Sequence, residues 1–178
     1  MTNRMSTAMT VKRLVIIALF AFLSISVSTF MSTSAAHAWP ARVVAVTDGD
    51  TITVEPLDGG DRVKVRLYGI DCPESKQPYG QVAKGFVNKA VLFQQVEIDQ
   101  KDIDRYKRVV AHVLLQDGRN LQELLLQAGL AWVYDGYCKN CQLWKVLQAE
   151  AKTERRGLWA DKNSVPPWEW RRAQRGAN

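Results

Sequence analysis

The feature that most constrains the fold is a run of three short segments with alternating apolar side chains, separated by two turns. The segments are RVVAVT (42–47), TITVEPL (51–57) and RVKVRLYGI (62–70), and the turns between them contain Asp-Gly and Gly-Gly pairs. Alternation with a period of two indicates a strand with one buried face. The turn glycines supply the positive φ that tight hairpins need. The sequence therefore predicts three hairpin-connected strands.

The rest of the domain alternates between helical and strand patterns. Helices are expected over 79–95, 120–129 and 142–156, and strands over 96–101 and 108–118. Asn120 is a suitable N-cap and Gly129 a suitable helix stop. Five short strands with a helix between the third and fourth favour an α+β fold, a five-stranded OB-type β-barrel with three helices packed outside it. A mixed sheet with helices on one face fits the same pattern.

Both ends of the chain differ from its middle. Residues 1–38 hold three basic residues, then an uncharged apolar run, then small residues ending in Ala-His-Ala, which is the order of a secretory signal peptide. An uncleaved membrane anchor is the alternative, because the apolar run is long enough to span a bilayer. Cleavage leaves one domain over 39–161 and a basic, mostly irregular tail over 162–178. We therefore expect an exported protein, periplasmic or secreted, with no stable membrane association after cleavage.

Charge and histidine content narrow the function. The formal net charge is +6, and basic residues gather in DRYKR (104–108) and in the tail, a distribution that suits a polyanion without identifying one. After the signal segment the sequence has one histidine, His112, in an apolar strand. A histidine in that setting is more typical of packing than of catalysis. Sites that need two histidines, a Ser-His-Asp set or an HExxH zinc motif are therefore excluded or strained.

Carboxylates stand where strands end. Asp48 and Asp50 frame one turn, and Asp71 and Glu74 frame DCPE directly after the third strand. Hard oxygen ligands gathered from two turns suit Ca²⁺ or Mg²⁺ rather than zinc. Taken singly, each motif is also compatible with ordinary turn chemistry.

Arginines supply the complementary charge. Arg66 lies on the strand face opposite the apolar residues, and Arg108 opens the fifth strand. Two guanidinium groups beside two carboxylates and a cation would suit a phosphodiester, since arginine binds phosphate oxygens in a bidentate manner. The alternative is a pair of solvated or salt-bridged surface arginines.

The ordered motifs DGDTITV, RVKVRLYGIDCPES, DRYKRVVAHV, NLQELLLQAGLAWVY and AEAKTERRGLW resemble the thermonuclease, or staphylococcal nuclease-like, family along nearly the whole domain after residue 38. The resemblance implies a five-stranded OB-type barrel with three helices. It also implies a calcium-dependent endonuclease, a hydrolase that cleaves DNA and RNA with little sequence specificity and leaves 3′-phosphorylated products.

The resemblance also assigns roles to residues of this chain. It makes Asp50 and Asp71 the side-chain ligands of Ca²⁺, with the backbone carbonyl of Cys72 as a third ligand. Glu74 falls on the position that activates the attacking water. The phosphate-binding arginines are Arg66 and Arg108, and the tyrosines near the nucleotide are Tyr106 and either Tyr134 or Tyr137.

Three departures from the family pattern stand out. Cys72 replaces a threonine, which matters little if the carbonyl is the ligand. Lys107 replaces a glycine in the turn before Arg108, so the delivery of that arginine is in question. The stretch after DCPES is shorter than in the best-known member, which points to a reduced substrate-side loop.

The remaining cysteines, Cys138 and Cys141, lie close together in YCKNC. In an exported protein a local disulfide is expected, and two free thiols are the alternative.

Two functional classes follow. The first is a monomeric, metal-dependent nuclease with DNA and RNA as substrates. The second is a noncatalytic OB-type module that binds nucleic acid or protein. Retention of acids beside the arginines favours the enzyme, because a pure polyanion-binding module has no need for carboxylates next to phosphate.

Overall fold

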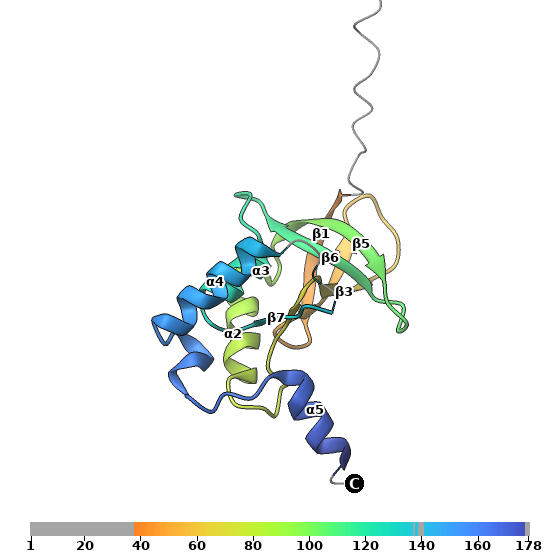
Figure 1. The fold of residues 1–178 in the computed structure, drawn as a ribbon. Coiled ribbons are helices and arrows are strands. Elements are labelled where there is room, and N and C mark those ends of the chain that lie inside the picture. Colours follow the sequence, from red (N-terminus) through yellow and green to blue (C-terminus); the bar gives the residue numbers. More distant parts are fainter. Residues whose placement is uncertain (1–37, 137, 139–140, 177–178) are drawn as a thin grey trace, which may run out of the picture. The chain divides into compact units, whose positions relative to one another are not determined.

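The computed structural model describes residues 38–136, 138 and 141–176, and its centre is a closed five-stranded β-barrel (Figure 1). The strands around the barrel are, in order, β1 (Ala38–Val46), β2 (Thr51–Pro56), β3 (Val63–Leu67), β6 (Val109–Leu115) and β5 (Gln95–Ile103). All neighbours pair antiparallel except β3 and β6, which are parallel. The predicted OB-type barrel is confirmed, and the open mixed sheet is excluded.

The third predicted strand is longer than β3 because the chain leaves the barrel at Gly69. That residue has φ of 70°, and a Cβ there would lie 2.7 Å from the sulfur of Cys138, so glycine is required for both conformation and space. Beyond the bend, β4 (Ile70–Asp71) pairs with β7 (Trp132–Val133) in a separate two-stranded sheet. This pairing places Asp71 outside the barrel wall.

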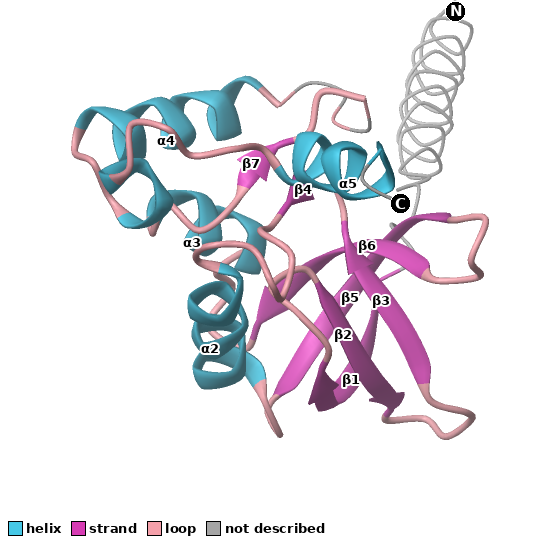
Figure 2. Ribbon diagram, turned by 90° about the horizontal axis from the view of Figure 1, so that it is seen from below, coloured by secondary structure: helices cyan, strands magenta, loops and turns pink. Residues whose placement is uncertain are grey.

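The predicted helices form with slightly narrower bounds. They are α2 (Gly80–Val91), α3 (Leu121–Gln127) and α4 (Gln142–Thr153), followed by a 3₁₀ turn, η1 (Gly157–Ala160). Asn120 caps α3 as expected, since its side-chain oxygen accepts hydrogen bonds from the backbone N–H groups of Gln122 and Glu123. Figure 2 shows these helices gathered on one side of the barrel.

The expectation of a mostly irregular tail over 162–178 is wrong for its second half. Residues Pro167–Gly176 form a further helix, α5, which follows a short irregular segment and makes four α-helices among the described residues. Pro167 begins the helix, Glu169 lies in its first turn and Arg175 in its last, an arrangement that suits the helix dipole. The ring of Trp168 also packs 5.9 Å from that of Trp132 in β7. This tertiary contact was not visible in the local sequence pattern.

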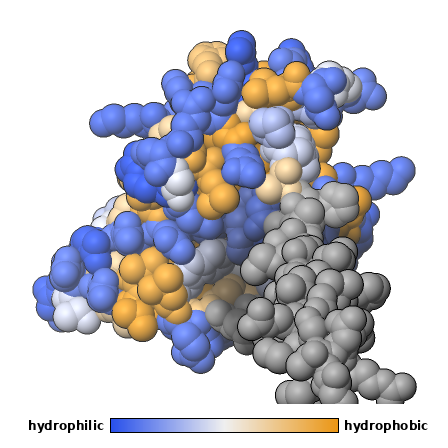
Figure 3. Space-filling view, turned by 90° about the horizontal axis from the view of Figure 1, so that it is seen from above, coloured by the Kyte–Doolittle hydropathy of each residue, from blue (hydrophilic) through white to orange (hydrophobic). Residues whose placement is uncertain are grey.

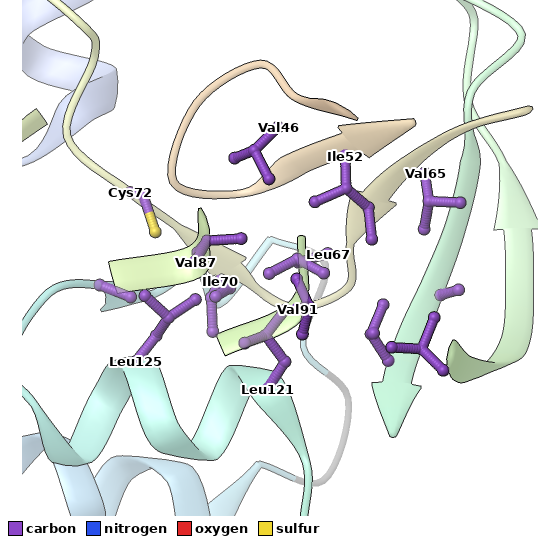
Figure 4. Close-up of a cluster of buried hydrophobic side chains, with 14 of the residues drawn as sticks. Val46, Ile52, Val65, Leu67, Ile70, Cys72, Val87, Val91, Leu121 and Leu125 are labelled. Atoms are coloured by element: carbon purple, nitrogen blue, oxygen red, sulfur yellow. The ribbon is translucent and has the colours of Figure 1, made fainter. Parts of the chain in front are cut away.

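One apolar core joins the barrel to the helices. Figure 4 shows Leu67 at the end of β3 beside Val87 and Val91 of α2 and Leu121 and Leu125 of α3. All five side chains are almost completely buried. Because such contacts connect β3, α2 and α3, the strand that carries Arg66 is held rigidly against the helices.

The face seen in Figure 3 is mostly hydrophilic, with hydrophobic side chains in separate patches. Within the part of the chain that the structure describes, no helix is both long enough and apolar enough to cross a membrane. The predicted signal segment, except for Ala38, lies outside the described residues, so both its identity and its cleavage stay predictions.

Gln122 is a buried polar residue that completes the edge of β6 beyond the end of β3. Its side-chain oxygen accepts a hydrogen bond from Val113 N at 3.2 Å, and its side-chain nitrogen donates to Ala111 O at 2.9 Å. The residue is fully buried. The Gln122 amide therefore takes the place that a neighbouring strand would occupy.

The substitution Gln122→Leu should lower the free energy of unfolding by about 1–3 kcal/mol, because it leaves the buried N–H of Val113 without its side-chain acceptor. Gln127→Leu is the matched control, since Gln127 is exposed on the same helix. Urea denaturation of both variants measures the difference. Equal stability of the two variants would contradict the role assigned to Gln122.

Candidate active site

The turn between β1 and β2 positions the carboxylate of Asp50. Asp48 Oδ1 accepts a hydrogen bond from Asp50 N at 3.0 Å, which closes the turn. A Cβ on Gly49 would lie 2.7 Å from that of Cys72 and 2.8 Å from that of Ala83. Only glycine lets the turn approach so closely, and Cys72 N donates to Asp50 Oδ2 at 2.7 Å. The two turns predicted to carry the acids are therefore in direct contact.

Arg66 connects these acids. One guanidinium nitrogen lies 3.1 Å from Asp50 Oδ2, and another lies 2.8 Å from Asp71 Oδ1. The Arg66 side chain is 17% exposed, and the two carboxylates are buried more deeply. Strand β3 thus delivers the arginine, and β4, directly after the bend at Gly69, delivers its second partner.

Glu74 lies in the loop between β4 and α2, which Gln77 holds in shape. Glu74 N donates to the side-chain oxygen of Gln77 at 3.1 Å, and Gln77 N donates to Glu74 O at 2.8 Å. Gly80, at the start of α2, packs against the Glu74 carbonyl with no room for a Cβ. These contacts fix the backbone of Glu74, while its side chain stays 39% exposed and within reach of water.

Arg171 of α5 joins the site, and the sequence did not identify it as a site residue. Its guanidinium donates to Glu74 Oε1 at 2.7 Å and to Asp71 Oδ2 at 2.8 Å, with a further bond of 3.3 Å to Asp71 Oδ1. Asp71 is consequently held by two arginines. The available signal was the repeated arginine in the basic tail, and it carried no information about a contact 100 residues away.

The site contains more negative charge than the arginines neutralise. The pKa of Asp50 is raised to about 7, mainly because the carboxyl is buried; Arg66 opposes the rise, and the nearby Asp48 and Asp71 add to it. Burial lowers the pKa of Arg66, but Asp50 and Asp71 raise it by more, so its net pKa is raised. Arg66 therefore stays charged, whereas Asp50 titrates near neutral pH.

The second predicted arginine makes a different contact. Arg108 Nε lies 2.7 Å from Asp104 Oδ2, in the turn between β5 and β6. Its guanidinium also lies 5.5 Å from the centre of the Tyr106 ring, so these two predicted substrate-side residues are neighbours. Among the described residues, Arg108 pairs with this turn carboxylate and not with Asp50, Asp71 or Glu74. Arg66 nevertheless pairs with Val110 in β6, and Arg108 precedes Val110 by two residues. Side chains two positions apart along a strand point to the same face, so Arg108 lies on the outer face shared with Arg66.

The turn before Arg108 requires a left-handed conformation at Lys107, the position where the family pattern has glycine. Lys107 has φ of 63°, a left-handed conformation that glycine adopts without strain. The turn therefore forms with lysine, at a conformational cost that the usual glycine avoids.

Of the two remaining predicted tyrosines, the structure describes Tyr134 but not Tyr137. The Tyr134 ring lies 5.3 Å from that of Trp168, and its backbone N–H donates to Gly69 O. Tyr134 is thus close to the bend that leads to Asp71. Tyr137 lies outside the described residues.

The cysteines separate into a pair and a single thiol. The structure joins Cys138 and Cys141 in a disulfide. Cys72 is a free, buried thiol, and burial raises its pKa well above the usual value. Cys72 therefore stays protonated, which leaves its backbone as the chemically relevant part.

The single histidine of the described chain occupies a packed position. His112 lies between the rings of Tyr68 and Trp144, at centroid distances of 5.2 and 5.5 Å. Its Nδ1 is 3.4 Å from an Asp99 carboxylate oxygen. These contacts account for His112 by packing, as its apolar strand indicated.

The acids of the site fit a hard divalent cation. Asp50 and Asp71 contact the same guanidinium, so their oxygens converge, and the three carboxylates of Asp50, Asp71 and Glu74 are paired with only the two guanidinium groups of Arg66 and Arg171. Carboxylate oxygens are the donors that Ca²⁺ prefers. Within the described ranges, no group of three or more His, Cys, Asp or Glu side chains is arranged to hold a metal ion. A cation at this position would rely on two carboxylates and backbone or water oxygens.

The pKa of Asp50 predicts a pH effect on stability. The pKa of the Asp50 carboxyl is 3.8 in the unfolded chain and about 7 in the folded protein, so the folded protein holds this proton more tightly. The resulting stabilisation is complete below pH 3.8 and is lost as the pH rises through about 7. Asp50→Asn cannot ionise, so its free energy of unfolding relative to the original protein should rise across this window by at least about 1 kcal/mol. Urea denaturation in EDTA over this range measures the change.

Asp58→Asn is the control, because Asp58 is exposed in the loop after β2. A parallel pH dependence in the original protein and in Asp50→Asn would show that Asp50 is not the titrating group.

Comparisons with known proteins identify the family of the chain. The staphylococcal nuclease homologue family matches residues 64–161, a span that includes Arg66, Asp71, Glu74 and Arg108 but neither Asp50 nor α5. An uncharacterized endonuclease of Escherichia coli is 43% identical over 130 residues, covering 73% of this chain and 83% of the relative. A micrococcal nuclease of Shigella flexneri is 37% identical over 146 residues, covering 76% and 82%. The chain belongs to the staphylococcal nuclease homologue family.

Proposed function

We propose that this chain is a calcium-dependent nuclease that hydrolyses phosphodiester bonds of DNA and RNA with little sequence specificity and leaves 3′-phosphorylated products. The observation that carries the proposal is the convergence of Asp50 and Asp71 on the guanidinium of Arg66, with Glu74 joined to Asp71 through Arg171. The names of the relatives support nucleic acid as the substrate. The calcium requirement and the product chemistry come from the family resemblance.

Arg66 is suited to bind the scissile phosphate. Its pKa is raised by the two carboxylates, so the guanidinium is charged at any working pH, and its orientation is fixed by contacts of 3.1 and 2.8 Å. A fixed guanidinium stabilises the charge that grows on phosphate oxygens without having to reorganise. Arg108, on the same outer face, would reach the phosphate once it leaves Asp104.

Glu74 is suited to act as the general base. Its backbone is held by Gln77, and its carboxylate is partly exposed, so a water molecule can approach it. A base must lie within hydrogen-bonding distance of the proton that it removes, and a fixed loop meets that condition better than a mobile one. In this proposal Glu74 accepts the proton of the attacking water while Arg66 holds the phosphate.

Asp50 and Asp71, with the Cys72 carbonyl, would hold the cation. When bound, Ca²⁺ would supply Lewis-acid stabilisation of the negative charge that develops on the phosphate. The two carboxylates are brought together by the turn at Gly49 and by the β4–β7 pairing, and both are buried. Their rigid support suits a ligand set that must bind without rearranging the backbone.

We also propose that the protein is exported to the periplasm or secreted, and acts as a monomer. The signal-like segment supports export. The disulfide between Cys138 and Cys141 is of the kind that persists in oxidising compartments.

The metal requirement gives one test. Cleavage of single-stranded DNA should require Ca²⁺ and stop in EDTA, and Asp71→Ala should raise the calcium concentration needed for half-maximal activity by at least about tenfold. Arg171→Ala should lower that concentration, because its guanidinium competes with a cation for Asp71.

Isothermal titration of calcium into the same variants gives a measurement that does not need hydrolysis. Arg172→Ala, one residue along α5, is the control for loss of a positive charge. Undiminished cleavage in EDTA would rule out the proposed metal dependence.

The base and the phosphate-binding arginine give a second test. Glu74→Gln keeps the shape of the side chain but loses the base, so kcat should fall by about a hundredfold to ten-thousandfold. Arg66→Lys keeps the charge but loses the bidentate geometry, and a comparable fall in kcat is expected. Steady-state kinetics on single-stranded DNA measure both effects.

Glu97→Gln and Arg62→Lys are matched controls at exposed positions, and thermal unfolding shows whether each variant is folded. A noncatalytic binding module predicts a different outcome, in which Glu74→Gln tightens polyanion binding by removing a negative charge. Cleavage by Glu74→Gln at the original rate would exclude the proposed mechanism.

A further inference from the structure

Helix α5 forms one wall of a groove that begins at the candidate general base. The groove has a volume of about 450 Å³ and lies between the loop after β4 and α5. Its lining residues are Glu74, Ser75, Lys76, Trp170, Arg171, Gln174 and Arg175. Because Glu74 belongs to this lining, the groove is continuous with the candidate active site.

The lining is predominantly cationic. Lys76 contributes one positive charge from the loop, and Arg171 and Arg175 contribute two from α5, against the single carboxylate of Glu74. Arg171 and Arg175 are four residues apart, so they share one helix face. Arg172 does not line the groove, although it lies on the same helix.

The helix that forms this wall is anchored at several points. The Gln77 side chain donates to Val165 O at 2.6 Å, which joins the Glu74 loop to the segment before α5. Trp168 packs on Trp132 and Tyr134, and Arg171 binds Asp71 and Glu74. Figure 2 shows α5 beside β4 and β7, in agreement with these contacts. The groove is therefore a built feature with two fixed walls.

Trp170 gives the groove an aromatic surface next to its positive charges. A cationic track with an aromatic side chain is the combination that binds single-stranded nucleic acid, because phosphates contact the cations while a base stacks on the ring. An acidic polypeptide would use the charges and leave the ring without a stacking partner. The composition of the lining therefore favours a nucleotide strand.

We propose that this groove is a substrate subsite, in which Lys76 and Arg175 bind a phosphate that flanks the scissile phosphodiester and Trp170 supports the adjoining base. This inference rests on the proposed nuclease function, since it extends the same site along the strand. It gives α5, which lies outside the span matched by the family, a role in holding substrate.

The test measures affinity for a fluorescein-labelled single-stranded DNA of about twelve nucleotides by anisotropy, in EDTA so that nothing is cleaved. Lys76→Ala and Arg175→Ala should each weaken binding by about three- to tenfold and should each reduce the slope of log K against log salt by about 1. Arg172→Ala is the matched control and should weaken binding by less than about twofold. Lys76 and Arg175 are exposed, so the folded state should be retained.

Three outcomes would overturn the subsite. Equal losses in Arg175→Ala and Arg172→Ala would show that only overall charge matters. Affinities of Lys76→Ala and Arg175→Ala that match the original protein would show that the groove is not used. Polyglutamate of matched charge that competes as strongly as unlabelled DNA, and that no longer competes in Lys76→Ala and Arg175→Ala, would show that the groove is a site for acidic polypeptide.

A separate assay with calcium and the same oligonucleotide reports hydrolysis. An absence of cleavage, together with groove-dependent binding, would reject the proposed function and leave the groove as a binding site for single-stranded nucleic acid, whereas cleavage without groove-dependent binding would reject the subsite alone.

Discussion

The ion pairs of Arg66 with Asp50 and Asp71 hold the candidate active site together. They join the turn after β1 to the segment after β3, two parts of the chain that the barrel would otherwise only bring near each other. Burying three charges is unfavourable unless each has partners, and here the Cys72 N–H and the second arginine, Arg171, supply them. The raised pKa of Asp50 shows that the compensation is incomplete. Converging carboxylates whose burial is only partly compensated are suited to bind a cation.

The fold serves this arrangement by bending one strand. Gly69 lets the chain leave β3, and the short β4–β7 pairing then fixes Asp71, while the tight contact of Gly49 with Cys72 fixes Asp50. The shared core between the barrel and α2 and α3 limits movement of these backbones. Because Asp71 lies beyond the barrel wall, α5 can pack over the site and bring Arg171 to Asp71 and Glu74. The C-terminal helix is thus part of the site's architecture.

Local chemistry made most of the barrel predictable. Alternating side chains and glycine turns indicated the five strands, and the Asn120 cap and the Gly129 stop bounded α3 to within two residues. The acids and Arg66 were identifiable because each lies next to a strand end, where side chains of different strands meet. Arg108 was identifiable as a residue type, but its pairing with Asp104 depends on a hairpin conformation that no local pattern specifies.

What the amino-acid pattern determined, then, was the class of fold, the order of its elements and a group of candidate residues, the acids and Arg66, for phosphodiester chemistry. Three-dimensional packing added α5 as a helix, the placement of Arg171 on Asp71 and Glu74, and the groove that continues from Glu74. The reason is physical: strand and turn preferences act between neighbours in the chain, whereas the contacts of Arg171 join residues about 100 positions apart. A helix of mostly polar residues becomes stable and specific when Trp168 and Arg171 find their partners, and those partners exist only once the barrel has folded.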